Sequence, residues 1–376
     1  MDQDLYYFAL CVALPLMLFF GVHMLFARTP DKTIFSNFLL SRRIMGAALL
    51  VLAANYSVHY FCSPRLTNVN ATISINLATY FLCYWLFSSA LITLLNNRYI
   101  TRRRIVLHLA MWLVFSTLSF VVIRWIPCGI AQNVSLAALA VWLLTYGTVL
   151  AVRMHRTYRK ALKTFNDTHS DDIGAYIRWL SVFTYWAAFF GVGCSILTFL
   201  PNKYIYIWVL SAIPFYIYLY CCYQNYMLFY ERVETAFQED MTMEQSAEAE
   251  STLAATQAAE SYTPAYHSEI EQRIKEWIDS EGFCKPGLTL KDLSDSLRTN
   301  RTYLSEYINS VYNMTFRDWI ADLRIQYAKR CMQEHPEQKI LEISERSGFL
   351  SPSHFTKTFS EKEGCSPARW RKNSGE

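Results

Sequence analysis

The side chains that support catalysis or metal binding in other proteins are scattered along this chain. Its 376 residues include 10 Cys and 8 His, but no two cysteines form a C-x-x-C pair and the histidines lack metal-ligand spacing. No nucleophile–base pairing or phosphate loop is present, and the 12 Gly are spread too thinly for the ATP-binding domain of a histidine kinase. We therefore predict no enzyme activity, no metal and no cofactor, which leaves recognition as the chemistry to be explained.

Charge divides the chain into three parts. Residues 1–230 hold 17 Lys and Arg against 6 Asp and Glu, residues 231–261 hold 1 against 8, and residues 262–376 hold 17 against 17. Hydrophobic residues make up 53% of the chain and charged residues only 18%, where about 25% is typical of soluble proteins. We expect a membrane domain at 1–230, an acidic linker at 231–262 and a compact, charge-rich domain at 263–376.

Apolar periodicity in the last part predicts two pairs of short helices joined by a longer helix. Thr289 is a suitable N-cap for a helix at 290–297, and a three-residue turn leads to a second helix at 301–312. The longer helix spans about 315–332, after which the pattern of two short helices repeats. Such a pair forms a helix-turn-helix, although periodicity alone is a weak signal because many helical hairpins look alike.

Specific residues in the second pair strengthen this interpretation. They resemble the signature of AraC/XylS-type transcription regulators over about 100 of the 376 residues. The matching positions are Gly348, Phe349, Ser351, Phe355, Lys357, Phe359, Gly364, Ser366, Pro367, Trp370 and Arg371. The first pair is similar too, and its Thr302–Ser305 form resembles that of regulators from Bacteroidetes-type bacteria.

The resemblance implies a double-stranded DNA partner, with two recognition helices in successive major grooves about 34 Å apart. Base-edge contacts are then expected from Thr302, Ser305, Glu306, Ser353, His354, Thr356 and Lys357. Phosphate contacts are expected from Arg301, Arg317, Lys339, Arg369 and Lys372. The chain departs from the family pattern at Arg298, where Gly is common, and at Ser344, where a small Ala is usual. Glu306 can accept from cytosine but repels phosphate.

Seven apolar stretches precede this domain, each roughly the length of a helix that crosses a bilayer. They lie near 5–27, 44–62, 72–95, 105–126, 134–152, 176–200 and 204–228. The connections at alternate ends hold 14 Lys and Arg on one side and three on the other. Because positive charge stays inside, we expect a multi-pass protein of the cytoplasmic (inner) membrane with its N-terminus outside and its C-terminal domain in the cytoplasm.

The expected fold class is thus all-α, a seven-helix transmembrane bundle followed by an AraC-type double helix-turn-helix domain. Within the spans, His59 and His108 are interpreted as interfacial or hydrogen-bonded core histidines. Asn55, Asn76 and Gln224 can bond helices together as easily as they can bind a ligand.

Two questions stay open at the level of sequence, the structure of the linker and the function of the whole chain. Residues 231–262 suit a mobile acidic linker with a helical start, or alternatively a helix that extends the seventh span. The leading function is a membrane-anchored regulator that couples an unknown ligand or membrane signal to transcription, with a homodimer as a possible state. The alternatives are a DNA-binding regulator with the spans as a passive anchor, or a membrane enzyme or transporter with an appended regulatory domain.

Overall fold

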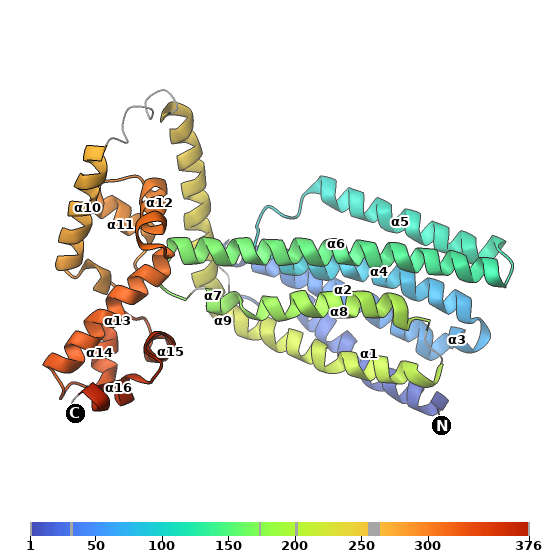
Figure 1. Ribbon diagram of the computed structural model, residues 1–376. Helices are drawn as coiled ribbons and strands as arrows, with labels where there is room; N and C mark the ends of the chain where they lie inside the picture. Colours follow the sequence, from blue (N-terminus) through green and yellow to red (C-terminus); the bar gives the residue numbers. More distant parts are fainter. Residues whose placement is uncertain (1, 31–32, 173, 200–201, 255–263, 375–376) are drawn as a thin grey trace. The chain divides into compact units, whose positions relative to one another are not determined.

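The structure, a computed structural model, describes residues 2–30, 33–172, 174–199, 202–254 and 264–374 (Figure 1). These residues form helices joined by turns, and the only extended pairing among them is an isolated antiparallel bridge between His169 and Thr289. The predicted all-α fold class is therefore confirmed. Contacts divide the chain into two compact units, residues 1–161 with 177–231 and residues 162–176 with 232–376.

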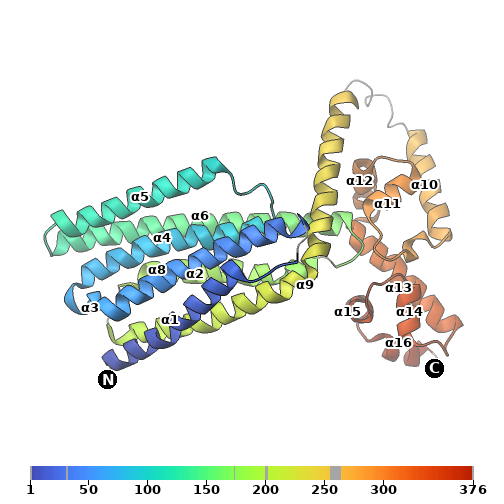
Figure 2. The same ribbon diagram turned by 180° about the vertical axis from the view of Figure 1, so that it is seen from behind.

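The first unit is a bundle of long helices that run side by side in both ribbon views (Figures 1 and 2). Its elements are α1 (Asp2–Phe26), η1 (Thr33–Phe35), α2 (Ser36–Cys62), α3 (Pro64–Thr67), α4 (Val69–Thr93), α5 (Arg102–Trp125), most of α6 (Ile130–Thr168), α8 (Trp179–Leu197) and the first part of α9 (Asn202–Ala254). The short helix α7 (Gly174–Ile177) precedes α8.

Six helices among the described residues are long and apolar enough to cross a membrane. They are Asp4–Phe26, Thr33–Cys62, Val69–Thr93, Arg102–Trp125, Ile130–Thr168 and Tyr204–Glu231. The remaining predicted span, 176–200, coincides with the 19-residue helix α8, which is not one of the six, so the seventh crossing stays a prediction.

Close contact between α1 and α2 depends on two glycines. A Cβ on Gly46 would lie 2.9 Å from the carbonyl oxygen of Gly21, and a Cβ on Gly21 would lie 2.7 Å from a methyl carbon of Leu50. Small residues at facing positions let two helix backbones approach closely.

The polar residues inside the bundle are bonded to one another. His59 lies between Tyr6, whose hydroxyl is 3.0 Å from its Nδ1, and Asn76, whose Oδ1 is 2.7 Å from its Nε2. Asn55 also donates to Asn76, at 3.2 Å, and the Nδ1 of His108 lies 2.8 Å from the Tyr146 hydroxyl. Of the two interpretations given for these histidines, the structure has the hydrogen-bonded core residue.

A cavity of about 100 Å³ lies among α2, α4, α6, α8 and α9 of this unit. Its lining is mostly apolar and includes the tyrosines Tyr56, Tyr80, Tyr84 and Tyr216.

Helix α9 continues without a break from the predicted span 204–228 to Ala254. The sequence left a mobile linker and a helical extension open for residues 231–262. The structure has the helical extension as far as 254, and residues 255–263 lie outside the described part.

The second unit contains a compact helical domain with its own hydrophobic core. The helices of the domain are α10 (Pro264–Asp279), η3 (Gly282–Cys284), α11 (Leu290–Leu297), α12 (Arg301–Tyr312), α13 (Phe316–Glu334), α14 (Ile340–Arg346), α15 (Pro352–Glu363) and α16 (Pro367–Ser374). The long helix α13 lies between the two short pairs, and its buried residues Trp319, Ile320 and Ile325 belong to the one core cluster shared by both pairs.

Candidate nucleic-acid interface

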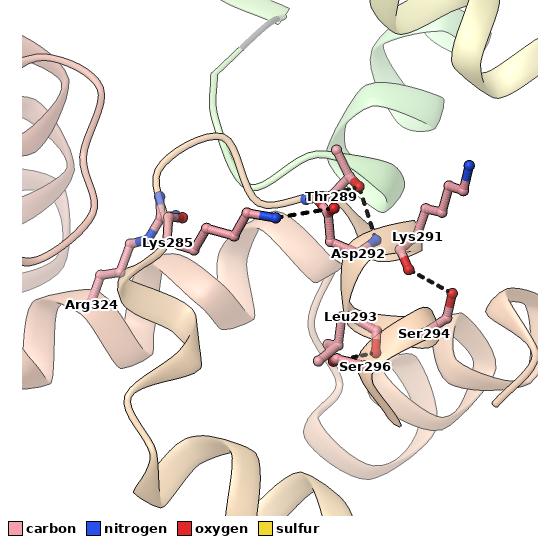
Figure 3. Close-up of polar contacts among 8 residues, drawn as sticks. All are labelled: Lys285, Thr289, Lys291, Asp292, Leu293, Ser294, Ser296 and Arg324. Carbon is pink, nitrogen blue, oxygen red and sulfur yellow. Dashed lines mark hydrogen bonds and ion pairs between the residues drawn. The ribbon is translucent and has the colours of Figure 1, made fainter. Parts of the chain in front are cut away.

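The first helix-turn-helix unit begins with a reciprocal cap on α11. The Asp292 N–H donates to the Thr289 hydroxyl at 3.1 Å, and the Thr289 N–H donates to the Asp292 carboxylate at 3.0 Å (Figure 3). Lys285 lies 3.2 Å from the same carboxylate. Burial alone would raise the pKa of Asp292, but the hydrogen bonds from Thr289 and Lys285 lower it overall. This capping box fixes where α11 starts.

The turn of this unit passes through a left-handed residue. Arg298 ends α11 with φ +50° and ψ +49°, a conformation that glycine adopts most easily. This explains why glycine is common at this position in the family that the sequence resembles. Two residues later Asn300 caps α12, because its side chain accepts the Thr302 N–H at 2.7 Å.

Helix α12 has one buried and one open face. Tyr303, Leu304, Tyr307 and Ile308 are buried in the core. The predicted base-contacting residues occupy the other face, where Thr302 and Glu306 are exposed and Ser305 is half-buried; Arg301, predicted to contact phosphate, is half-buried at the start of the helix.

The second helix-turn-helix depends on a glycine in its turn. Gly348 has φ +80°, and a Cβ placed on it would lie 2.4 Å from the carbonyl oxygen of Cys284. The turn leads into α15, whose N-cap is Ser351: its hydroxyl accepts the His354 N–H at 3.2 Å. Pro352 takes the first helical position, where a missing N–H costs nothing.

Helix α15 repeats the division of faces seen in α12. Phe355 and Phe359 are fully buried, while Ser353, Thr356 and Lys357 are exposed. His354 is half-buried against the ring of Phe349. Burial lowers the pKa of His354 against the opposing effect of Asp172, so its imidazole is neutral near pH 7 and can either donate or accept a hydrogen bond.

The predicted phosphate contacts differ in their surroundings. Lys339, Arg369 and Lys372 are exposed, at the start of α14 and along α16. Arg317 is instead half-buried in the first turn of α13, where its guanidinium lies 3.1 Å from Asp172 and 2.9 Å from the side-chain oxygen of Asn166.

Two arginines that we did not assign to DNA hold the domain together. Arg324 is 1% exposed and donates to the carbonyls of Phe283 at 2.9 Å and Lys285 at 2.8 Å. Arg371 donates to the carbonyls of Pro336 and Gln338 and so fastens the loop before α14. Arg371 is a matching position of the signature, but the spacing of the signature does not reveal that its side chain is bonded within the domain.

The second departure from the family pattern lies in the core. Ser344 is fully buried, and its hydroxyl has no hydrogen-bond partner among the described residues. An unsatisfied buried hydroxyl lowers stability, which explains why alanine is usual at this position.

Comparisons with known proteins agree with this geometry. A family model described as a helix-turn-helix domain matches residues 293–373. The HTH-type transcriptional regulator ExsA of Pseudomonas aeruginosa is 33% identical over 87 residues, which are 23% of this chain and 31% of that protein. The virulence regulon transcriptional activator VirF of Yersinia enterocolitica is 28% identical over 101 residues, 27% of this chain and 36% of that protein.

A further relative, the Msm operon regulatory protein of Streptococcus mutans, is 27% identical over 120 residues, 32% of this chain and 41% of that protein. The chain thus spans less than half of the length of each of these relatives. No solved structure matches the chain significantly.

The two helix-turn-helix pairs each have a recognition helix with one open face. The C-terminal part of the chain is therefore of the double helix-turn-helix class. The matched residues identify it further: the C-terminal part of this chain is an AraC-type helix-turn-helix domain. Groups of three or more His, Cys, Asp or Glu side chains that could hold a metal ion do not occur among the described residues.

Proposed function

We propose that the chain is a membrane-anchored, sequence-specific DNA-binding transcription regulator. The observation that carries the proposal is the pair of recognition helices, α12 and α15, each with a polar face open beside a buried one, in a domain whose relatives are named as transcription regulators. The base-contacting and phosphate-contacting residues predicted from the sequence are the contacts we propose for that domain.

Membrane anchoring is the second part of the proposal. Its support is the six apolar helices and the count of 14 Lys and Arg on one side of the predicted bundle against three on the other. Seven crossings with that charge distribution leave the DNA-binding domain in the cytoplasm, where DNA is available. The test fuses, after residue 254, a reporter enzyme that works only outside the cytoplasm. Activity of this fusion would contradict the proposed orientation.

Signal coupling is the third part. The tyrosine-lined cavity in the bundle is a suitable place for a small apolar or aromatic ligand, and the unbroken helix α9 connects the last predicted span to the region before the DNA-binding domain. Replacing residues 1–200 with an unrelated anchor should abolish inducible control. Retained control in that chimera would favour the alternative, in which the spans are a passive anchor.

DNA recognition is tested by selecting genomic fragments with the full chain in detergent at fixed salt. We expect a few sites that share a motif, and weaker recovery with Lys357→Ala. Lys362→Ala is the matched control, because Lys362 lies on the same helix, pairs with Asp322 at 3.1 Å and is not a proposed DNA contact. Recovery at background level by the unmodified chain, at low salt as well, would overturn the proposed DNA binding.

A further inference from the structure

A segment from between two predicted spans belongs to the same compact unit as the DNA-binding domain. Residues 162–176 follow the predicted span 134–152, yet they group with residues 232–376. The contact includes backbone: the Ser170 N–H donates to the carbonyl of Leu288 at 3.0 Å, and His169 pairs with Thr289 as an antiparallel bridge. The segment is therefore held in a fixed register against Leu288 and Thr289, the two residues that precede α11.

The first of two adjacent carboxylates in the segment is an internal anchor. Asp171 is 9% exposed and lies 3.5 Å from the guanidinium of Arg324, which also donates to the Ser170 hydroxyl at 3.4 Å. Burial penalises both charges: it raises the pKa of Asp171 and lowers that of Arg324, although each opposes the shift of the other. A buried ion pair of this kind fixes the position of the segment on the domain more than it stabilises the folded state.

The second carboxylate lies against residues proposed to contact DNA. One oxygen of Asp172 is 3.1 Å from the Arg317 guanidinium, and the other is 3.6 Å from the Lys357 ammonium. The Asp172 side chain is only 8% exposed, so its charge is directed at these two cations rather than at solvent. Asn166, from the same segment, accepts a further hydrogen bond from Arg317 at 2.9 Å.

This arrangement resembles what the two cations would meet on DNA. Arg317 is a proposed phosphate contact and Lys357 a proposed base contact, and a carboxylate between them neutralises the charge that would otherwise attract a phosphate. The segment and DNA therefore compete for the same two donors.

We propose that residues 162–172 are a built-in competitor of DNA: while the segment is docked, Asp172 occupies Arg317 and Lys357, and DNA binding requires its release. The proposal rests on the proposed DNA-binding function. It makes the connection between two predicted spans the part of the membrane domain that controls access to the recognition surface.

The first test compares the binding of the full chain in detergent to a mixed-sequence duplex about 40 base pairs long over a range of salt. Asp172→Asn removes the competing charge with little change of shape. We expect it to bind at least about tenfold more tightly at low salt, with a steeper salt dependence, because the phosphate contact of Arg317 becomes available and adds about 0.9 to the slope. Asp167→Asn is the control, since it makes the same charge change five residues earlier.

The second test locks the segment in place. Residues paired in an antiparallel bridge lie within the Cα separation of a disulfide, about 4.4–6.8 Å. His169→Cys combined with Thr289→Cys should therefore trap the docked state on oxidation. The oxidised protein should lose DNA binding and regain it on reduction, while neither single variant responds to oxidation.

The outcomes separate the inference from the function on which it rests. Equal binding by the unmodified chain, Asp172→Asn and the oxidised double variant would overturn the competitor and leave DNA binding standing. Absence of binding by every form, reduced and at low salt, would overturn both.

Discussion

Replacing Gly348 by alanine tests how the second helix-turn-helix is built. Two costs add at this position. A side chain at φ +80° adopts a left-handed conformation that costs about 1 kcal/mol, and the new methyl group would lie 2.4 Å from the Cys284 carbonyl oxygen. That carbonyl cannot easily move, because Arg324 fastens the carbonyls on either side of it, those of Phe283 and Lys285. Overpacking of this kind typically adds about 1–3 kcal/mol, so we expect a total of about 3 kcal/mol.

Gly364→Ala separates the two costs. Gly364 has a similar φ of +72°, but a Cβ there meets nothing within 4 Å, so only the conformational cost of about 1 kcal/mol applies. Both variants are compared by native-state hydrogen exchange of the full chain in detergent, read on peptides from α13 and α15. Equal loss of protection in the two variants would refute the reasoning, since it would mean that the close approach to Cys284 has no energetic consequence.

Three further predictions follow from single side chains. Arg298→Gly should stabilise the domain by up to about 1 kcal/mol, because it relieves the left-handed conformation at φ +50°; loss of stability would show that the Arg298 side chain contributes more than its backbone costs. Ser344→Ala should stabilise it by about 1 kcal/mol by removing a buried hydroxyl without a described partner, and an unchanged free energy of unfolding would contradict this. Docking of residues 162–172 should weaken by about 1 kcal/mol between pH 7.5 and 5.5, measured by hydrogen exchange of that segment, and His169→Gln should remove this response.

The sign of the pH effect comes from His169. Burial, with a contribution from Arg301, lowers the pKa of His169 from 6.5 to about 4, against the opposing effect of Asp292. A histidine with a lowered pKa is neutral when docked, so its contribution is complete above about pH 6.5 and is lost as the pH falls toward 4. The raised pKa of Asp171 acts in the opposite direction at lower pH, which is why the comparison stops at 5.5.

Local structure in the DNA-binding domain was predictable from the sequence. The helices expected at 290–297 and 301–312 have those bounds in the structure, because Thr289 and Asn300 are strong caps next to clear apolar periodicity. The start of the second span was predicted at 44, whereas α2 begins at Ser36. The expected boundary followed hydropathy, but the polar residues before 44, among them Arg42 and Arg43, continue the helix beyond the apolar stretch.

The proposed site was predictable only in part. The open faces of α12 and α15 follow from helical periodicity, so Thr302, Glu306, Ser353, Thr356 and Lys357 were placed correctly on exposed surface, although their contacts with DNA stay a proposal. The pairing of Arg317 with Asp172 was not predictable, because 145 positions separate the two residues and nothing local links them. Long-range ion pairs depend on tertiary packing, which a single sequence does not reveal.

The second compact unit is built from two separate pieces of chain, residues 162–176 and 232–376. This limits how its domain can be exchanged between genes. AraC-type domains occur in proteins that share only this part with the present chain, as expected of a module exchanged between genes. Here, however, Arg317 and Arg324 of the module pair with Asp172 and Asp171, which are encoded upstream of the linker. An exchange at the linker would bring in a new domain without the acidic residues matched to its cations. Related chains that contain both parts should therefore vary these acidic positions together with those of Arg317 and Lys357, so that the two parts of the gene evolve as one.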